Sequence, residues 1–289
     1  MKDGFNGQRM IVLPQAIRQM MKGDALMQNL HITDIGHYPK AKFHLINRPQ
    51  GTEEYIFLYC IAGSGTCQID TVSHSINAGQ YIILPAGTGH RYESSASDPW
   101  TIYWFHFSGT QAPYFAHDMD SPHDLQPGTL TRINERNQLF EEMYQTLDRS
   151  FAHESLCYVT TLLYRYLGTL TFIREYRDAT DSQHPHSDID KYIHYMKENI
   201  EKPLSLDEMA RFSGYSASHF SALFKARTGY PPLTYFNMLK IQQACHMLTD
   251  SDMKISQICH KVGIGDVFYF SRLFHKIMGM APQDYRSSH

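Results

Sequence analysis

Apolar and polar residues follow two different patterns along the chain. Between residues 43 and 108, short apolar runs such as Tyr55–Ala62, Tyr81–Leu84 and Thr101–Phe107 are separated by turns rich in glycine and proline. Short strands at a spacing of about 8–12 residues with such turns are typical of a β-sandwich or a small barrel. We therefore expect a β-barrel over about residues 30–110.

The pattern becomes helical after the barrel. Apolar residues recur every fourth position from Leu139 to Phe151, and again at helical spacing from Leu163 to Leu170. An apolar stripe along one side is typical of a helix that packs against a core or a partner. We expect two such helices, over about residues 134–150 and 154–177.

A polar segment then separates two domains. Residues 178–187 contain one proline and few apolar residues, which is typical of an interdomain linker. The chain has 289 residues, enough for two domains. We expect an α+β fold, with a β-barrel and its flanking helices over residues 1–177 and an all-α domain over residues 188–289.

The all-α domain contains an internal repeat. Phe220–Lys225 matches Phe270–His275 at an offset of 50 residues, and a Gly, a Pro and a Tyr follow each copy at the same spacing. Such self-similarity indicates two copies of one structural unit. We place the units at about residues 205–226 and 254–276.

Each unit has the pattern of a helix-turn-helix. In the first unit, Ser205 and Glu208 have capping-box spacing, Gly214 supplies a turn, and Ser216 begins the second helix. The second helix of such a unit can lie in the major groove of DNA and present side chains to base edges. The candidate DNA-contacting residues are Ser218, His219, Ser221 and Lys225 in the first unit, and Asp266, Val267, Phe268, Ser271 and Arg272 in the second.

A single helix-turn-helix can also be only a stable way to pack two short helices. Two copies joined by one helix, at about Leu233–Leu248, favour DNA binding. That helix spans about 24 Å at 1.5 Å per residue. With the offset of each recognition helix, the separation comes near the ~34 Å of one DNA turn.

Residues 190–287 resemble the DNA-binding domain of the AraC/XylS family of bacterial transcription regulators. The segment Ile255–Arg286 is closest to the family signature. The resemblance implies two recognition helices that read adjacent major grooves of promoter DNA. One departure is Ala222, which stands where the family often carries an arginine in the first recognition helix.

A second resemblance concerns the barrel. The spacing of Gly79, Pro85, Gly87 and His90 resembles the second motif of the cupin barrel. In cupin enzymes that histidine binds a metal together with an HxH pair and a glutamate, but the HxH pair is missing from the corresponding strands here. Because a metal site needs three or four converging ligands, we expect no metal and no cofactor, and His90 becomes a wall residue of the pocket.

Four segments of the barrel resemble the sensor domain of the same regulator family: Arg48–Gly51, Gly63–Gly65, Pro85–Tyr92 and Trp100–Phe107. The resemblance implies ligand contacts from Arg48, Tyr92 and Trp104, with Tyr38, Tyr103, His106 and His90 as further candidates. Aromatic faces stack on a sugar ring and an arginine engages its oxygens, so the chemistry is consistent with a sugar or a related metabolite. The alternatives are plain core packing for the aromatic residues and a rim ion pair for Arg48.

Composition argues against a membrane-spanning segment and a secretion signal, and charge gives a weak indication of the partner. The apolar stretches are far shorter than the ~20 residues that span a bilayer, and the N-terminus lacks the pattern of a secretion signal. The five cysteines form no CxxC pair, which is typical of reduced thiols in the cytoplasm. From residue 188 onward 12 Lys and Arg stand against 10 Asp and Glu, a weak indication of a polyanionic partner.

These patterns together predict a cytoplasmic transcription regulator that is not an enzyme. Its expected partners are promoter DNA, a small-molecule effector, the transcription machinery and a second copy of the chain, joined through the helices at 134–177. Residues 1–30 are expected to form an arm anchored by Met10–Leu13. The alternatives are a metal-dependent cupin enzyme, and a regulator whose barrel is only a dimerisation scaffold.

Overall fold

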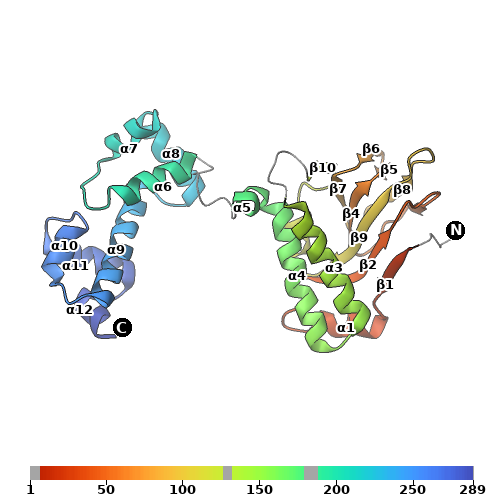
Figure 1. Ribbon diagram of the computed structural model, residues 1–289, viewed down its shortest axis with the longest axis horizontal. Coiled ribbons are helices and arrows are strands. Elements are labelled where there is room, and N and C mark those ends of the chain that lie inside the picture. Colours follow the sequence, from red (N-terminus) through yellow and green to blue (C-terminus); the bar gives the residue numbers. More distant parts are fainter. Residues whose placement is uncertain (1–6, 126–131, 179–187, 289) are drawn as a thin grey trace. The chain divides into compact units, whose positions relative to one another are not determined.

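The computed structural model describes residues 7–125, 132–178 and 188–288 (Figure 1). Contacts divide the chain into two compact units, residues 1–181 and 182–289. Most of the predicted linker lies outside the described residues. In the described part of the chain, no helix is both long enough and apolar enough to cross a membrane.

The N-terminal unit contains two antiparallel sheets that face each other. The larger sheet has the order β1-β2-β9-β4-β7-β10 and the smaller the order β3-β8-β5-β6. The strands of the larger sheet are β1 (Arg9–Val12), β2 (His31–Tyr38), β4 (Tyr55–Ala62), β7 (Gln80–Leu84), β9 (Thr101–Ser108) and β10 (His123–Asp124). Those of the smaller sheet are β3 (Leu45–Arg48), β5 (Ser64–Ile69), β6 (Val72–Asn77) and β8 (His90–Ser94).

Strand alternation gives the larger sheet two buried faces. On β4, Leu58 and Cys60 point into the core between the two sheets, whereas Phe57 and Tyr59 point into a second core on the opposite face. Successive side chains of a strand point to opposite faces, so neighbours in sequence enter different cores. This alternation determines which residues of β9 can reach a pocket between the sheets.

Helices cover the outer face of the larger sheet (Figure 1). Two of them, α3 (Ile133–Arg149) and α4 (His153–Thr171), pack against each other and place their apolar stripes on the sheet. The predicted helix over 154–177 is interrupted at Phe172, whose φ of −109° and ψ of 50° are not helical. The remaining helices of this unit are α1 (Gln15–Gly23), α2 (Ala112–Ala116) and α5 (Ile173–Asp178).

The C-terminal unit is all-helical and has two cores. The helix α9 (Pro232–Asp250) contributes Phe236 to one core and Ile241 to the other. The first core joins α9 to α6 (Asp188–Glu198), α7 (Leu206–Ser213) and α8 (Ala217–Thr228). The second joins it to α10 (Ile255–Lys261), α11 (Val267–Met278) and α12 (Pro282–Ser288).

The helix-start signals of the first helix-turn-helix are confirmed. The Ser205 side chain accepts a hydrogen bond from the Glu208 backbone N–H at 3.2 Å, and the Glu208 carboxylate accepts one from the Ser205 backbone N–H at 2.8 Å. Gly214 ends α7 with a φ of 74°, which favours glycine. The Ser216 hydroxyl accepts the His219 backbone N–H and so begins α8.

Candidate functional site

A pocket of about 160 Å³ lies between the two sheets. It is much smaller than the roughly 300–1,000 Å³ of pockets that hold drug-sized ligands, so its volume favours a small metabolite. Strands of both sheets line it, and the N-terminal strand β1 forms one wall. The lining residues are Met10, Val12, Asp34, Tyr38, His44, Ile46, Arg48, Leu58, Tyr92, Ile102, Trp104 and His106.

Two hydrogen-bond donors in this pocket are buried without an acceptor. These are Nη1 of Arg48 and Nε1 of Trp104, for which none of the described residues supplies a hydrogen bond. A buried donor without a partner costs about 1–3 kcal/mol. Two such donors on the lining of one pocket are available to acceptor atoms of a bound molecule.

Aromatic rings form much of the pocket wall. Tyr38 meets Trp104 edge to face, with ring centroids 5.2 Å apart, and His44 packs on Tyr92 at 5.6 Å. Burial raises the pKa of the Tyr92 hydroxyl, so it remains a neutral group beside Arg48. The wall therefore presents flat apolar faces next to polar donors, which suits a ring that carries hydroxyl groups.

The acidic side of the pocket is held by an ion-pair network. Both carboxylate oxygens of Asp34 accept hydrogen bonds from Nη2 of Arg18, at 2.9 and 3.0 Å, and His106 Nδ1 lies 3.4 Å from Asp34. Burial opposes the charge on Asp34, but His106, Thr33 and Arg18 together hold its pKa below the usual value. Asp34 and Arg18 were not among the sequence candidates.

The strand β1 connects the pocket to the helices. Met10 and Val12 face the pocket from β1, and the Tyr38 hydroxyl lies 3.2 Å from the Met10 sulfur. Arg9, the residue before Met10, forms an ion pair with Glu141 of α3 at 2.7 Å. The predicted arm over residues 1–30 therefore contains a strand paired with β2, and residues 1–6 of it lie outside the described part.

Two of the predicted ligand residues lie elsewhere. Tyr103 lies on the helix-covered face of the larger sheet and not in the pocket. Its ring stacks on Phe140 and its hydroxyl donates a hydrogen bond to Glu141. His90 is not among the lining residues: it is buried, its ring stacks on Tyr92, and its Nδ1 lies 2.9 Å from the Thr88 carbonyl oxygen. Burial lowers the pKa of His90. Tyr38, Arg48, Tyr92, Trp104 and His106 do line the pocket.

The predicted DNA-contacting residues of α8 are mostly exposed. Ser218, His219 and Lys225 are open to solvent, and Ser221 is half-buried. The His219 ring stacks on Tyr215 with centroids 4.7 Å apart, which fixes its direction. The N-terminal end of α8 therefore presents an imidazole and hydroxyl groups to solvent, and Lys225 lies further along the helix.

On α11 the exposed candidates are mainly aromatic and cationic. Phe268 is 81% exposed, an unusual position for a phenyl ring, and Arg272 is exposed one turn later. The exposed Asp266 also caps the helix, because its carboxylate accepts the backbone N–H groups of Phe268 and Tyr269. Ser271 and Val267 are half-buried, and the Ser271 hydroxyl donates to the Val267 carbonyl oxygen.

A buried lysine joins the two helix-turn-helix units. Nζ of Lys240, on α9, donates hydrogen bonds to the backbone carbonyl oxygens of Ile200, Lys202 and Val262. The first two carbonyls belong to the segment before α7, and the third follows α10. Burial lowers the pKa of Lys240 to about 8, so the ammonium keeps three donors at neutral pH. The lysine was not predicted from the sequence.

Comparison with known proteins identifies the two units. The AraC-like ligand binding domain matches residues 37–163, and a helix-turn-helix domain matches residues 209–288. The chain belongs to the AraC family of transcription regulators. This AraC-family chain therefore has the predicted α+β fold and the predicted function of a DNA-binding regulator, and the two alternative functions are not favoured.

Operon regulators are among its relatives. The regulatory protein of the MmsAB operon of Pseudomonas aeruginosa is 29% identical over 95% of this chain and 88% of that protein. The lactose operon transcription activator of Staphylococcus xylosus is 24% identical over 86% of this chain and 84% of that protein. The arabinose operon regulatory protein of Escherichia coli is 24% identical over 84% and 83%.

Proposed function

We propose that the chain regulates transcription in response to a small oxygen-rich metabolite, a monosaccharide or a similar hydroxylated compound, bound between the two sheets. The observation that carries the proposal is the pair of unpaired donors, Arg48 Nη1 and Trp104 Nε1, on the lining of one small pocket. Each ligand oxygen that pairs with a buried donor removes a desolvation penalty. The names of two relatives, regulators of lactose and arabinose operons, support a sugar.

The pocket limits the size of the effector. A volume of about 160 Å³ is small for a ligand pocket, and we expect it to favour a monosaccharide over an oligosaccharide. Asp34 is already hydrogen-bonded by Arg18, so the free polar groups of the pocket are mainly donors, and they favour hydroxyl or carboxylate oxygens on the ligand.

DNA recognition is assigned to the exposed residues of α8 and α11. His219 and Lys225 would contact DNA from the first unit, and Phe268 and Arg272 from the second. Arginine can bridge O6 and N7 of guanine, and an apolar side chain can contact the methyl group of thymine. The lysine at position 240 would keep the two recognition helices at a fixed separation.

The chain is further proposed to act as a cytoplasmic homodimer that contacts the transcription machinery and catalyses no reaction. Tyr158 on α4 is 47% exposed, and Phe151 in the connection between α3 and α4 is 37% exposed. Exposed aromatic side chains on and beside paired helices suit a self-complementary contact between two copies. Its relatives are transcription regulators, which supports a role without catalysis.

The test combines a ligand screen with DNA binding by the full chain. Thermal unfolding is measured against monosaccharides, small hydroxy acids and oligosaccharides, because a ligand that binds only the folded state raises its stability. Genomic fragments selected by the purified chain then supply the DNA for anisotropy measurements with and without each hit. We expect a monosaccharide-sized hit to change DNA affinity; hits confined to oligosaccharides, or no selected DNA, would contradict the proposal.

A further inference from the structure

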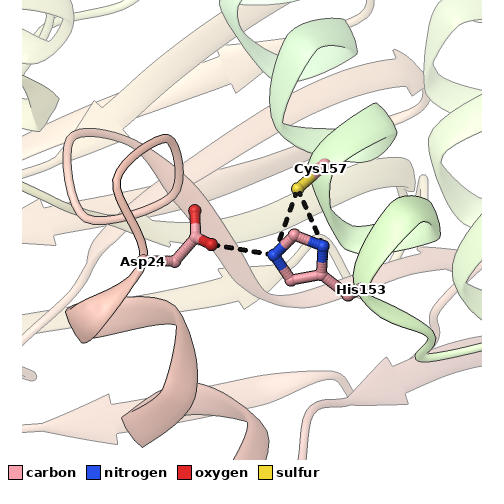
Figure 2. A group of neighbouring side chains, drawn as sticks. All are labelled: Asp24, His153 and Cys157. Carbon is pink, nitrogen blue, oxygen red and sulfur yellow. Dashed lines mark hydrogen bonds and ion pairs between the residues drawn. The ribbon is translucent and has the colours of Figure 1, made fainter.

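Three side chains with metal-binding atoms meet where the N-terminal segment ends. Asp24 follows α1, and His153 and Cys157 lie four residues apart on the first two turns of α4 (Figure 2). One ligand atom from each lies within 4.8 Å of the others. The group therefore joins two segments that are 129 residues apart in the sequence.

The distances between the three ligand atoms are close to those between the ligands of a coordinated metal ion. Nε2 of His153 lies 2.8 Å from Oδ2 of Asp24 and 3.7 Å from Sγ of Cys157. In a tetrahedral zinc site, a nitrogen and a sulfur ligand are about 3.5 Å apart, and a nitrogen and an oxygen ligand about 3.3 Å. The nitrogen–sulfur distance is therefore already near the tetrahedral value, and coordination would lengthen the nitrogen–oxygen distance by about 0.5 Å.

The local structure orients the carboxylate. Oδ1 of Asp24 accepts the backbone N–H groups of Leu26 and Met27, at 2.8 and 3.0 Å, which leaves Oδ2 directed at His153 (Figure 2). These hydrogen bonds and the one from His153 lower the pKa of Asp24 to about 2, so it is an anion at neutral pH. On α4, a spacing of four residues places His153 and Cys157 on one face.

We propose that Asp24, His153 and Cys157 bind a zinc ion, with a solvent molecule as the fourth ligand. A thiolate, an imidazole and a carboxylate are the donor set of zinc, whereas magnesium and calcium prefer oxygen ligands alone. The His153 side chain is 59% exposed, which gives the ion access and leaves room for the solvent ligand. On binding, the S–H bond of Cys157 breaks, an S–Zn bond forms and the proton passes to solvent.

Such a zinc ion would crosslink the N-terminal segment, residues 7–24, to α4. The segment that precedes Asp24 contains β1, whose Met10 and Val12 line the pocket, and α1, whose Arg18 holds Asp34. A zinc ion at Asp24 would fasten the end of this segment to the helices that cover the sheet. The site does not depend on the proposed effector, because none of its three residues lines the pocket.

The experiment uses the full chain and cobalt as a spectroscopic probe for zinc. We expect one cobalt per chain with a thiolate-to-cobalt charge-transfer band, which added zinc abolishes by displacement. Cys157→Ser should remove the band. His153→Gln and Asp24→Asn should weaken cobalt binding by more than the roughly 10–100-fold that is lost when a group hydrogen-bonded to a metal ligand is removed. Asparagine keeps the oxygen that accepts the N–H groups of Leu26 and Met27, so the turn is retained.

Two matched controls separate this site from general surface binding. His194 and Glu198 form an exposed pair at 3.1 Å without a cysteine, so His194→Gln should leave cobalt binding unchanged. Cys245→Ser removes a half-buried thiol elsewhere and should leave the band unchanged. Zinc should raise the melting temperature of the wild type but not of Cys157→Ser. A chain without the band, or binding that survives Cys157→Ser, would overturn the proposal.

Discussion

Gly36 and Trp104 are paired across β2 and β9, and the indole ring occupies the space where a side chain at position 36 would lie. A β-carbon on Gly36 would come within 2.5 Å of Cζ2 of Trp104 and 2.8 Å of the Arg9 carbonyl oxygen. The glycine therefore lets the indole lie against β2 and lets β1 approach, and both features shape the pocket.

The substitution Gly36→Ala should displace Trp104 and close or distort the pocket. We expect a loss of about 1–3 kcal/mol in the free energy of unfolding, the usual cost of overpacking, and loss of the ligand-induced rise in melting temperature. Both tryptophans, Trp100 and Trp104, lie in the N-terminal unit, so their fluorescence follows its unfolding. Gly168→Ala is the control, because nothing lies within 4 Å of that β-carbon and the position is helical.

Gly168→Ala should leave the free energy of unfolding unchanged or raise it, because alanine inside a helix is more stable than glycine by about 0.5–1 kcal/mol. If Gly36→Ala kept both its melting temperature and its ligand response, the close contact with Trp104 would not shape the site.

Arg48→Ala should strongly weaken the ligand response and preserve the fold. Nη1 of Arg48 lacks a partner among the described residues, so its removal breaks no hydrogen bond of that atom within the chain. Loss of its contact with ligand oxygens should weaken binding about tenfold to a hundredfold, or about 1–3 kcal/mol. Melting temperature with and without the effector identified by the screen gives both quantities.

Arg48→Lys keeps the charge but loses the planar pair of donors, so it should restore only part of the affinity. A structural ion pair would give the opposite result: a lower melting temperature of the free Arg48→Ala chain and an undiminished ligand-induced shift.

Strand β9 shows which features of the N-terminal unit can be predicted from the sequence and which cannot. The run from Thr101 to Phe107 predicts a strand, but it is apolar on both faces, so its pattern does not say which side faces the ligand. The structure places Trp104 in the pocket and Tyr103 on the helices. Asp34 was missed because its role depends on Arg18, a residue brought to it by the folding of the N-terminal segment.

The helix-turn-helix units were easier to predict because their signals are local. Capping residues such as Ser205 and Ser216 act within three positions of themselves, and the repeat supplies a second copy of the pattern. Lys240 was missed, since its three carbonyl partners lie 22 to 40 residues away. The capping role of Asp266 was also missed, because an exposed residue at a helix start can cap the helix or contact DNA, and the pattern is the same for both.

Lys240 should make the stability of the C-terminal unit depend on pH. Its pKa is lowered by burial to about 8, against 10.5 in an unfolded chain. Between these values the unfolded chain binds more protons, so the free energy of unfolding should rise with pH by up to about 3 kcal/mol. Hydrogen exchange of the α9 backbone amides measures the unfolding of the C-terminal unit separately from that of the N-terminal unit.

Lys240→Met is the matching variant, because it keeps the length of the side chain and removes the titrating group. It should eliminate this component of the pH dependence. At neutral pH it should lower the free energy of unfolding by about 1–3 kcal/mol, since three buried carbonyl groups lose their donor. An identical pH dependence in the variant and the wild type would assign the effect to other groups.

Arg272→Ala should reduce the discrimination between selected and random DNA. Arg272 lies exposed on α11, one turn after the exposed Phe268, where a guanidinium can bridge O6 and N7 of a guanine. We expect the ratio of specific to nonspecific affinity to fall by about 1–3 kcal/mol, or about tenfold to a hundredfold. Anisotropy titrations at several salt concentrations measure this ratio.

The matched control is Lys276→Ala, one further turn along the same helix, which removes one positive charge of an exposed side chain. If Lys276 contacts only phosphate, its loss weakens binding to all sequences about equally and reduces the dependence on salt by about one counterion. The two variants therefore differ in kind: one changes the specificity ratio, the other the salt slope. If Arg272→Ala weakened all sequences equally, Arg272 would be a phosphate contact, and base recognition by α11 would rest on Phe268 and its neighbours.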